Sequence, residues 1–351
     1  MLTNPADILA AIPSLLGFYP QESLVIVFFH CELIDEQPQF SLGPTIRCDL
    51  DDAHALTELR TLDLGVDDHD LAFAFIISPR VSAFTRPMPM TKAIAEDLDP
   101  IIRVVEDLMS LADDPTCDKH VDACWAAESI SVGEPYSLVF TAVDPDTLAD
   151  AWCQGGIGEV VSSAAIDPWV EAGRLPEASR GEVMSRFDPE RSPLGIEDQW
   201  FLYEYAREAA SGELNIPWLI GDLEEFLDDP LAPDEGFALA LGATICGSIE
   251  ARDAALAPFL ERPEEAAEWA LVLAQSLSGE ARANALCLYA AACLGSRLPV
   301  DAVPALLTAG QEQPHHTLTA LMLGALLEGK YNELREALRD GSLHARRGGW
   351  E

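Results

Sequence analysis

The chain has 351 residues, of which 49% are hydrophobic, so it holds enough apolar material for the cores of two domains. Its formal net charge of −39 disfavours binding to nucleic acid or to anionic membranes, because both are bound through clusters of lysine and arginine. No apolar run approaches the roughly 18 to 20 residues that span a bilayer, and the N-terminus lacks the basic and apolar segments of a secretory signal. We therefore expect a cytoplasmic protein.

The opening of the chain predicts a helix that leads into a buried strand. Residues 6–16 carry apolar side chains at helical spacing, with Pro13 expected to cap or kink the helix. Residues 23–29 (SLVIVFF) form an apolar run without polar alternation, which is typical of a strand buried on both faces.

The turn between them, residues 19–23, is predicted to be a structural corner. The hydroxyl of Ser23 is expected to hydrogen-bond the turn backbone. A ligand contact for Ser23 is disfavoured, because the strand that it starts points its carboxyl end, where ligands gather, the other way.

The rest of the first half alternates between strands and helices. Further strands are predicted at residues 45–50, 71–78, 121–130 and 136–143, and helices at residues 52–64 and 101–114. A turn at residues 131–135 predicts that the last two strands form a hairpin. Residues 1–145 are thus predicted to be an α/β domain, a mixed sheet with flanking helices.

The second half is predicted to be all-α. Residues 146–193 are rich in proline and glycine and indicate a connecting region, residues 194–345 are periodic only at helical spacing, and residues 346–351 form a tail. Two similar helical hairpins carry Gly295 and Gly329, 34 residues apart. That period is typical of tetratricopeptide-like arrays, and a plain helical bundle is the alternative.

Two motifs resemble ligand sites without completing one. The spacing Cys117-x2-His120-x3-Cys124 lacks a fourth ligand, so no metal site is expected, and the eight cysteines are expected to be reduced and largely buried. Residues 153–160 (CQGGIGEV) match no phosphate-loop pattern and are interpreted as a flexible helix start. His316, at a predicted helix start, indicates a surface cap.

Basic residues are scarce, so the places where they gather are informative. Ser78, Arg80 and Arg86 follow the strand at residues 71–78, at the sheet edge where ligands of parallel sheets collect. Arg47 and Arg180 complete a candidate set for an anionic ligand, because guanidinium groups suit bidentate contacts with anions. A plain strand exit is the alternative for the first group.

A second cationic segment precedes the helical half. It consists of Arg174, Arg180, Arg186 and Arg191. The segment is interpreted either as an anion clamp or as a set of ion pairs with nearby carboxylates, and the 60 acidic residues favour ion pairs.

The opening string ILAAIPSLLGFYPQESLVIVFF resembles the signature of an actinobacterial family of unknown function, the domain-of-unknown-function family numbered 4192. The matching positions are Pro13, residues 15–18, Pro20, Ser23 and residues 25–27. The strings IRCDL and AGRLPEASRGEV and the C-terminal helices are similar to later parts of that family. The resemblance implies the two-part architecture and a high-GC Gram-positive cytoplasm, and it implies no activity.

The sequence thus favours an acidic, non-catalytic interaction or regulatory protein without a cofactor, whose helical half contacts a protein partner. The alternative is a small-molecule enzyme or ligand-binding module that holds an anion through the arginines at the sheet edge.

Overall fold

The computed structural model describes residues 4–34, 37–52, 71–82, 101–109, 121–229 and 235–347. The chain forms two compact units, residues 1–180 and 181–351. The boundary falls inside the predicted connecting region. Residues 53–64 of the predicted helix at residues 52–64 lie outside the described residues.

The first unit contains a mixed sheet of six strands in the order β2-β1-β3-β4-β5-β6. The strands are β1 (Ser23–Ile34), β2 (Gln37–Asp49), β3 (Leu71–Ile77), β4 (Ala123–Ala127), β5 (Pro135–Thr141) and β6 (Gln154–Gly156). β3 and β4 are parallel, and the other neighbouring pairs are antiparallel. The mixed sheet and the β4–β5 hairpin are confirmed, and β1 and β2 extend further than predicted.

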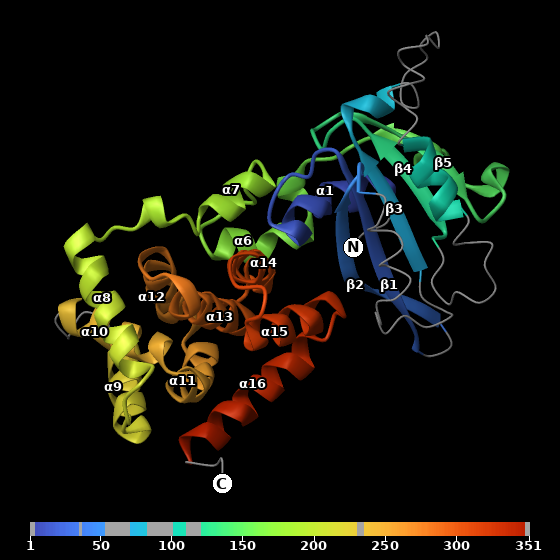
Figure 1. Cartoon of the computed structure of the whole chain (residues 1–351). Coiled ribbons are helices and arrows are strands. Elements are labelled where there is room, and N and C mark those ends of the chain that lie inside the picture. Colours follow the sequence, from blue (N-terminus) through green and yellow to red (C-terminus); the bar gives the residue numbers. More distant parts are fainter. Residues whose placement is uncertain are drawn as a thin grey trace. The chain divides into compact units, whose positions relative to one another are not determined.

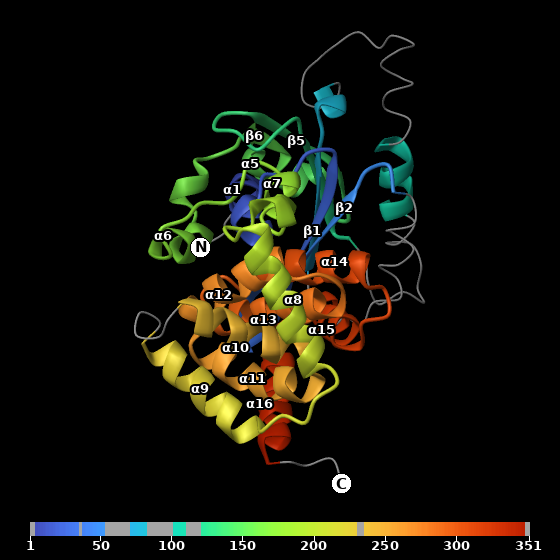
Figure 2. The same cartoon turned by 60° about the vertical axis from the view of Figure 1, so that its left-hand side comes forward.

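Helices cover both faces of this sheet. Figure 2 shows α1 (Pro5–Leu16) and the helix of residues 101–109, in teal, on opposite sides of the strands. Leu24 and Ile26 of β1 belong to the core on the side of residues 101–109, while Val25 and Val27 are buried as well. β1 is therefore buried on both faces, as its unbroken apolar run predicts.

Local signals set the ends of α1. The Asn4 side chain accepts a hydrogen bond from the Asp7 N–H, and Gly17 ends the helix in the left-handed conformation with φ 84°. Pro13 lies inside the helix and does not break it. Because α1 is short and its apolar face is buried, packing outweighs the hydrogen bond that proline removes.

Residues 146–180 belong to the first unit. β6 extends the sheet beside β5, and the Trp169 indole donates to the Ser14 carbonyl oxygen at 3.0 Å. Tyr19 N–H donates to the Glu177 carbonyl oxygen at 3.0 Å. This part of the predicted connecting region therefore closes over the first helix and turn.

The second unit is all-α, as predicted (Figure 1). Its helices are α8 (Ile196–Ala209), α9 (Ile216–Asp228), α10 (Glu235–Gly247), α11 (Ile249–Glu261), α12 (Pro263–Ser276), α13 (Gly279–Gly295), α14 (Ala302–Glu312), α15 (Thr317–Leu327) and α16 (Tyr331–Arg346). α13 is the central helix, buried along most of its length and in contact with α10, α11, α12 and α14. The short helices α5 (Asp150–Cys153), α6 (Asp167–Glu171) and α7 (Arg180–Ser185) precede this bundle.

Glycine allows two close helix contacts in the second unit. A Cβ at Gly247 would lie 2.2 Å from the Ala206 carbonyl oxygen, and one at Gly295 would lie 2.2 Å from the Leu260 carbonyl oxygen. Gly329, by contrast, follows α15 in the left-handed conformation with φ 72°. The two glycines of the proposed repeat thus serve different purposes, and a tetratricopeptide-like array stays a prediction.

Candidate functional site

Strand direction brings the opening turn to the predicted site. β1 is antiparallel to β2 and β3, so Ser23, the first residue of β1, pairs with Asp49 at the end of β2 and with Ile77 at the end of β3. The carboxyl end of β1 does point the other way, as predicted, but because β1 is antiparallel to β3, Ser23 still lies at the edge where β3 ends.

Two buried serines lie at this edge. Ser78 Oγ donates to Glu22 Oε2 at 3.0 Å and accepts from the Arg80 N–H at 3.1 Å. Ser23 Oγ donates to the Gln21 carbonyl oxygen at 2.7 Å and accepts from Arg47 Nε at 2.9 Å. The predicted bond from Ser23 to the turn backbone is confirmed, and both hydroxyls serve to hold the corner.

The arginines at the edge are paired with carboxylates. Arg80 Nε lies 2.8 Å from Glu22 Oε2, and its Nη1 lies 3.0 Å from Asp51 Oδ1. Arg47 and Arg180 share Asp49, with Arg180 Nη1 at 3.5 Å. We call this set the sheet-edge cluster: Glu22, Ser23, Arg47, Asp49, Asp51, Ser78, Arg80 and Arg180.

Charge balance within the sheet-edge cluster limits what it attracts. Burial alone would lower the pKa of Arg80, but the hydrogen bonds that Arg80 donates to Asp51 and Glu22 outweigh burial and raise it. The side chain of Asp51 is 72% exposed, against 22% for Arg80. A ligand from solvent therefore meets carboxylates first, and an anion has to displace them.

Backbone geometry at the corner is unusual. Glu22 has φ 46°, the one positive value for a non-glycine residue in the described ranges. This conformation costs about 1–3 kcal/mol, and such residues gather at functional or tightly constrained positions. Its carbonyl oxygen accepts the Leu50 N–H at 3.0 Å, and its side chain holds Ser78 and Arg80, so the surrounding contacts offset the strain.

Four of the five predicted ligand residues thus lie in one cluster: Ser78, Arg80, Arg47 and Arg180. Arg86 lies outside the described residues. Sequence reasoning missed the acidic partners Glu22, Asp49 and Asp51, although Asp49 lies near the end of the predicted strand at residues 45–50 and Asp51 directly follows it.

The second cationic segment divides among local partners. The Arg174 guanidinium lies 5.3 Å from the centre of the Trp169 ring, and Arg186 Nη1 lies 3.3 Å from Asp301 Oδ2. Arg180 pairs with Asp49, so Arg174, Arg180 and Arg186 each contact a different partner. This arrangement matches the ion-pair interpretation better than a common clamp.

The two incomplete motifs have structural roles where they can be followed. Cys124 is buried in β4, where burial raises its pKa far above the ordinary thiol value, while Cys117 and His120 lie outside the described residues. No group of three potential metal ligands occurs within the described ranges.

The glycine-rich motif also has a structural role. Residues 154–156 form β6, so the predicted helix start was wrong. A Cβ at Gly155 would lie 2.6 Å from the Tyr136 hydroxyl, so glycine is needed for this close contact with β5.

A buried polar cluster lies in the second unit. Arg252 Nη1 donates to Asn284 Oδ1 at 2.7 Å, and His316 Nε2 lies 2.9 Å from the same oxygen. His316 Nδ1 accepts the Thr319 N–H at 3.3 Å and so caps α15. Burial and the Arg252 charge lower the pKa of His316, and burial raises the pKa of Cys287 to about 11. A neutral imidazole and a protonated thiol suit a structural role.

Helix α8 exposes an unusual set of aromatic side chains. We call this set the α8 aromatic surface: Trp200, Phe201, Tyr203 and Tyr205, each between 46% and 58% exposed. The Trp200 and Phe201 rings meet edge to face at 5.2 Å. At 3.6 residues per turn, Trp200 and Tyr203 lie on one side of the helix and Phe201 and Tyr205 on the other. The buried residues of α8, which face the core of the helical unit, are Leu202, Ala206 and Ala209.

The fold and these sites define a two-unit protein, an α/β unit followed by a helical unit. The chain belongs to the family described as "Domain of unknown function (DUF4192)", whose model matches residues 5–331. No curated protein and no solved structure matches it. Among the described residues, no helix has the length and apolar character needed to cross a membrane.

Proposed function

We propose that the protein is a non-catalytic, cytoplasmic interaction protein whose helical unit binds a basic segment of a partner protein. The observation that carries the proposal is the α8 aromatic surface. Large exposed aromatic side chains are rare on solvated helices, and tryptophan and tyrosine supply most of the energy at the centres of protein interfaces.

The charges of α8 indicate the chemistry of the partner. The helix carries four carboxylates, Glu197, Asp198, Glu204 and Glu208, against one guanidinium, Arg207. Arg207 Nη2 lies 2.5 Å from Glu204 Oε2, so one of the four is already paired. Aromatic faces beside carboxylates suit arginine, because the guanidinium stacks on the ring while its N–H groups reach the acid.

The same charges argue against a second copy of this chain as the occupant. Two α8 surfaces would bring like charges together within a chain whose net charge is −39. A basic partner is attracted both by the carboxylates of α8 and by the negative electrostatic field of the whole chain. This attraction raises the association rate at low salt.

The proposal is tested by affinity capture followed by binding with purified components. The wild-type protein and a Trp200→Ala/Tyr203→Ala variant are used as baits, and each captured protein is then purified and titrated. We expect a partner whose binding segment is rich in arginine or lysine, with affinity about tenfold lower for the variant and falling with added salt.

Trp218→Ala is the matched control, because Trp218 is an exposed tryptophan of the same unit that does not belong to the α8 aromatic surface. It should bind like the wild type. A purified partner that is acidic, or that binds the double variant as tightly as the wild type, would show that the proposal is wrong.

A second candidate function is binding of an anionic ligand at the sheet-edge cluster. It is supported by the gathering of Arg47, Arg80 and Arg180 beside two serines. An anion here competes with Glu22 for Arg80, so Glu22→Gln should tighten citrate or phosphate binding and Arg80→Ala or Ser78→Ala should abolish it. If thermal-shift titrations of these variants match those of the wild type, this candidate fails.

A further inference from the structure

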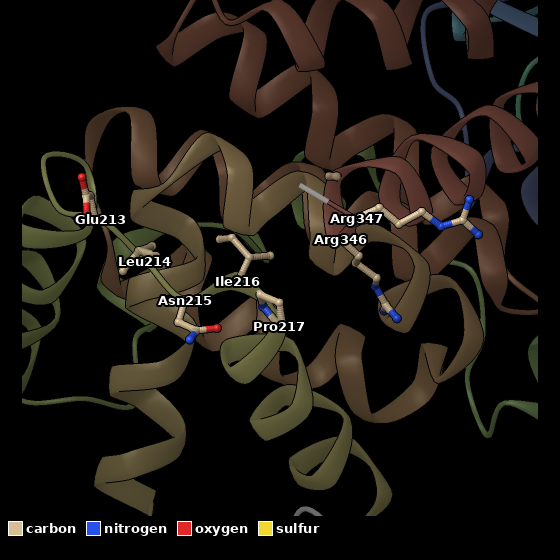
Figure 3. Close-up of a pocket in the computed structure, with 8 residues that line it drawn as sticks. Glu213, Leu214, Asn215, Ile216, Pro217, Arg346 and Arg347 are labelled. Carbon is tan, nitrogen blue, oxygen red and sulfur yellow. The ribbon is translucent and has the colours of Figure 1, made fainter. Parts of the chain in front are cut away.

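A pocket of about 590 Å³ lies in the helical unit, between the start of α9 and the end of α16. We call it the α9–α16 pocket; it is lined by Glu213, Leu214, Asn215, Ile216, Pro217, Ala345, Arg346 and Arg347. Figure 3 shows the segment from Glu213 to Pro217 on one side and the two arginines on the other. We propose that this pocket binds a small organic anion, a carboxylate carried on an apolar body.

Arg346 supplies a cation that its neighbours hold in place. Its Nη1 lies 2.8 Å from Glu224 Oε1, and its Nε donates to the Ala254 carbonyl oxygen at 3.1 Å. These contacts hold the guanidinium in place. Its Nη2 is buried and has no hydrogen-bond partner in the described part of the chain. The Arg346 side chain is nevertheless 23% exposed and lines the pocket, so an anion there meets the exposed part of this cation while its buried contacts stay in place.

Arg347 supplies a second, movable cation. It is exposed, and no ion pair of its side chain occurs in the described ranges. Figure 3 shows its side chain extended away from Ile216 and Pro217. Because an exposed arginine changes rotamer at little cost, it can turn toward a ligand that is already held by Arg346.

The opposite wall explains why the ligand needs an apolar body. Leu214, Ile216 and Pro217 present aliphatic surface to the pocket. The 13-residue helix α9 begins here and directs the positive end of its dipole to the same space, which adds to the attraction supplied by the arginines. The volume lies within the range of small-ligand pockets.

Two carboxylates limit the charge of the ligand. Glu213 lines the pocket, and Glu224 already neutralises part of Arg346. A head group with one negative charge therefore fits better than a dense polyanion such as a triphosphate. Arg346 and Arg347 lie beyond the family match, which ends at residue 331, so the pocket is partly built from sequence outside that match.

The test uses 4-phenylbutyrate as the probe, with the neutral 4-phenylbutanol and inorganic phosphate for comparison, titrated into the full chain by calorimetry. We expect 4-phenylbutyrate to bind and the alcohol to bind about tenfold more weakly, because the alcohol lacks the charge that Arg346 recognises. Inorganic phosphate should also bind more weakly, since it leaves the apolar wall uncovered.

Variants then locate the site. Arg346→Gln should weaken 4-phenylbutyrate binding about tenfold and Arg347→Ala about threefold. Arg347→Ala removes only an exposed side chain, so it remains informative if Arg346→Gln perturbs folding. Arg335→Ala, on the same helix but not in the pocket, is the control and should bind like the wild type.

The proposal is overturned if the probe fails to bind at about 10 mM, if the alcohol binds equally, or if both pocket variants bind like the wild type. Trp200→Ala/Tyr203→Ala should leave probe binding unchanged. The pocket and the α8 aromatic surface can therefore succeed or fail separately.

Discussion

At the scale of single residues, the most informative titratable group is His316. It is neutral in the fold because burial, and then the charge of Arg252, lower its pKa, while Glu280 and Asp253 act weakly in the opposite sense. In the unfolded chain its pKa returns to about 6.5. As pH falls below that value, the unfolded state gains a proton that the folded state resists, so the free energy of unfolding decreases. Above it, His316 contributes no pH dependence.

His316→Asn isolates this effect, because asparagine can still accept the Thr319 N–H as a helix cap but does not titrate. Urea unfolding of both proteins at pH of about 7.5 and 5.5 should show that the wild type loses more stability on acidification than the variant does. If the two proteins lose equal stability, the lowered pKa of His316 does not contribute to the pH dependence of the free energy of unfolding.

The candidate site shows what residue patterns reveal and what they leave out. Strand-end positions correctly grouped Ser78 and Arg80, because the residues that follow a strand lie together at the edge of the sheet. They did not reveal that Glu22 would hold both. That contact joins positions 56 and 58 residues apart, and it depends on the antiparallel placement of β1, which no local pattern specifies. His316, interpreted as a surface cap, is buried because Arg252 and Asn284 of other helices contact it, and no local pattern specifies those contacts either.

At the scale of elements, helix contacts depend on particular glycines. Gly247→Ala should destabilise the helical unit by about 1–3 kcal/mol, because the new methyl group has to push α8 away at Ala206. Gly341→Ala is the control, since Gly341 lies within α16 and a Cβ there meets nothing within 4 Å. It should stabilise the helix by about 0.5–1 kcal/mol. Equal effects in chemical denaturation would contradict the close-contact explanation.

The helices and strands were easier to predict than the way in which they pair in the fold. Unbroken apolar runs gave β1 and β3, and helical periodicity gave the whole second half, because both signals are local. β6 was missed because three residues carry no period, and its two glycines resembled a loop. The length of β2 was underestimated because Pro38, Gly43 and Pro44 interrupt it, which an edge strand tolerates.

At the scale of the whole molecule, the boundary between the units can be tested directly. A fragment of residues 1–180 should fold, because it keeps β6, Trp169 and the contacts of Glu177. A fragment of residues 1–145 should fail to unfold cooperatively in urea, since it leaves the Trp169 side of α1 uncovered. Cooperative unfolding of both fragments with equal stability would place the boundary at the earlier position.

The contacts that close the first unit also order events during synthesis. Ser14 and Tyr19 leave the ribosome early, but their partners Trp169 and Glu177 follow about 155 residues later. At about 5–20 residues per second, α1 waits about 8 to 30 s before those partners emerge. During that interval the side of α1 that Trp169 later covers has no partner from its own chain, which gives a chaperone a surface to bind on the nascent protein.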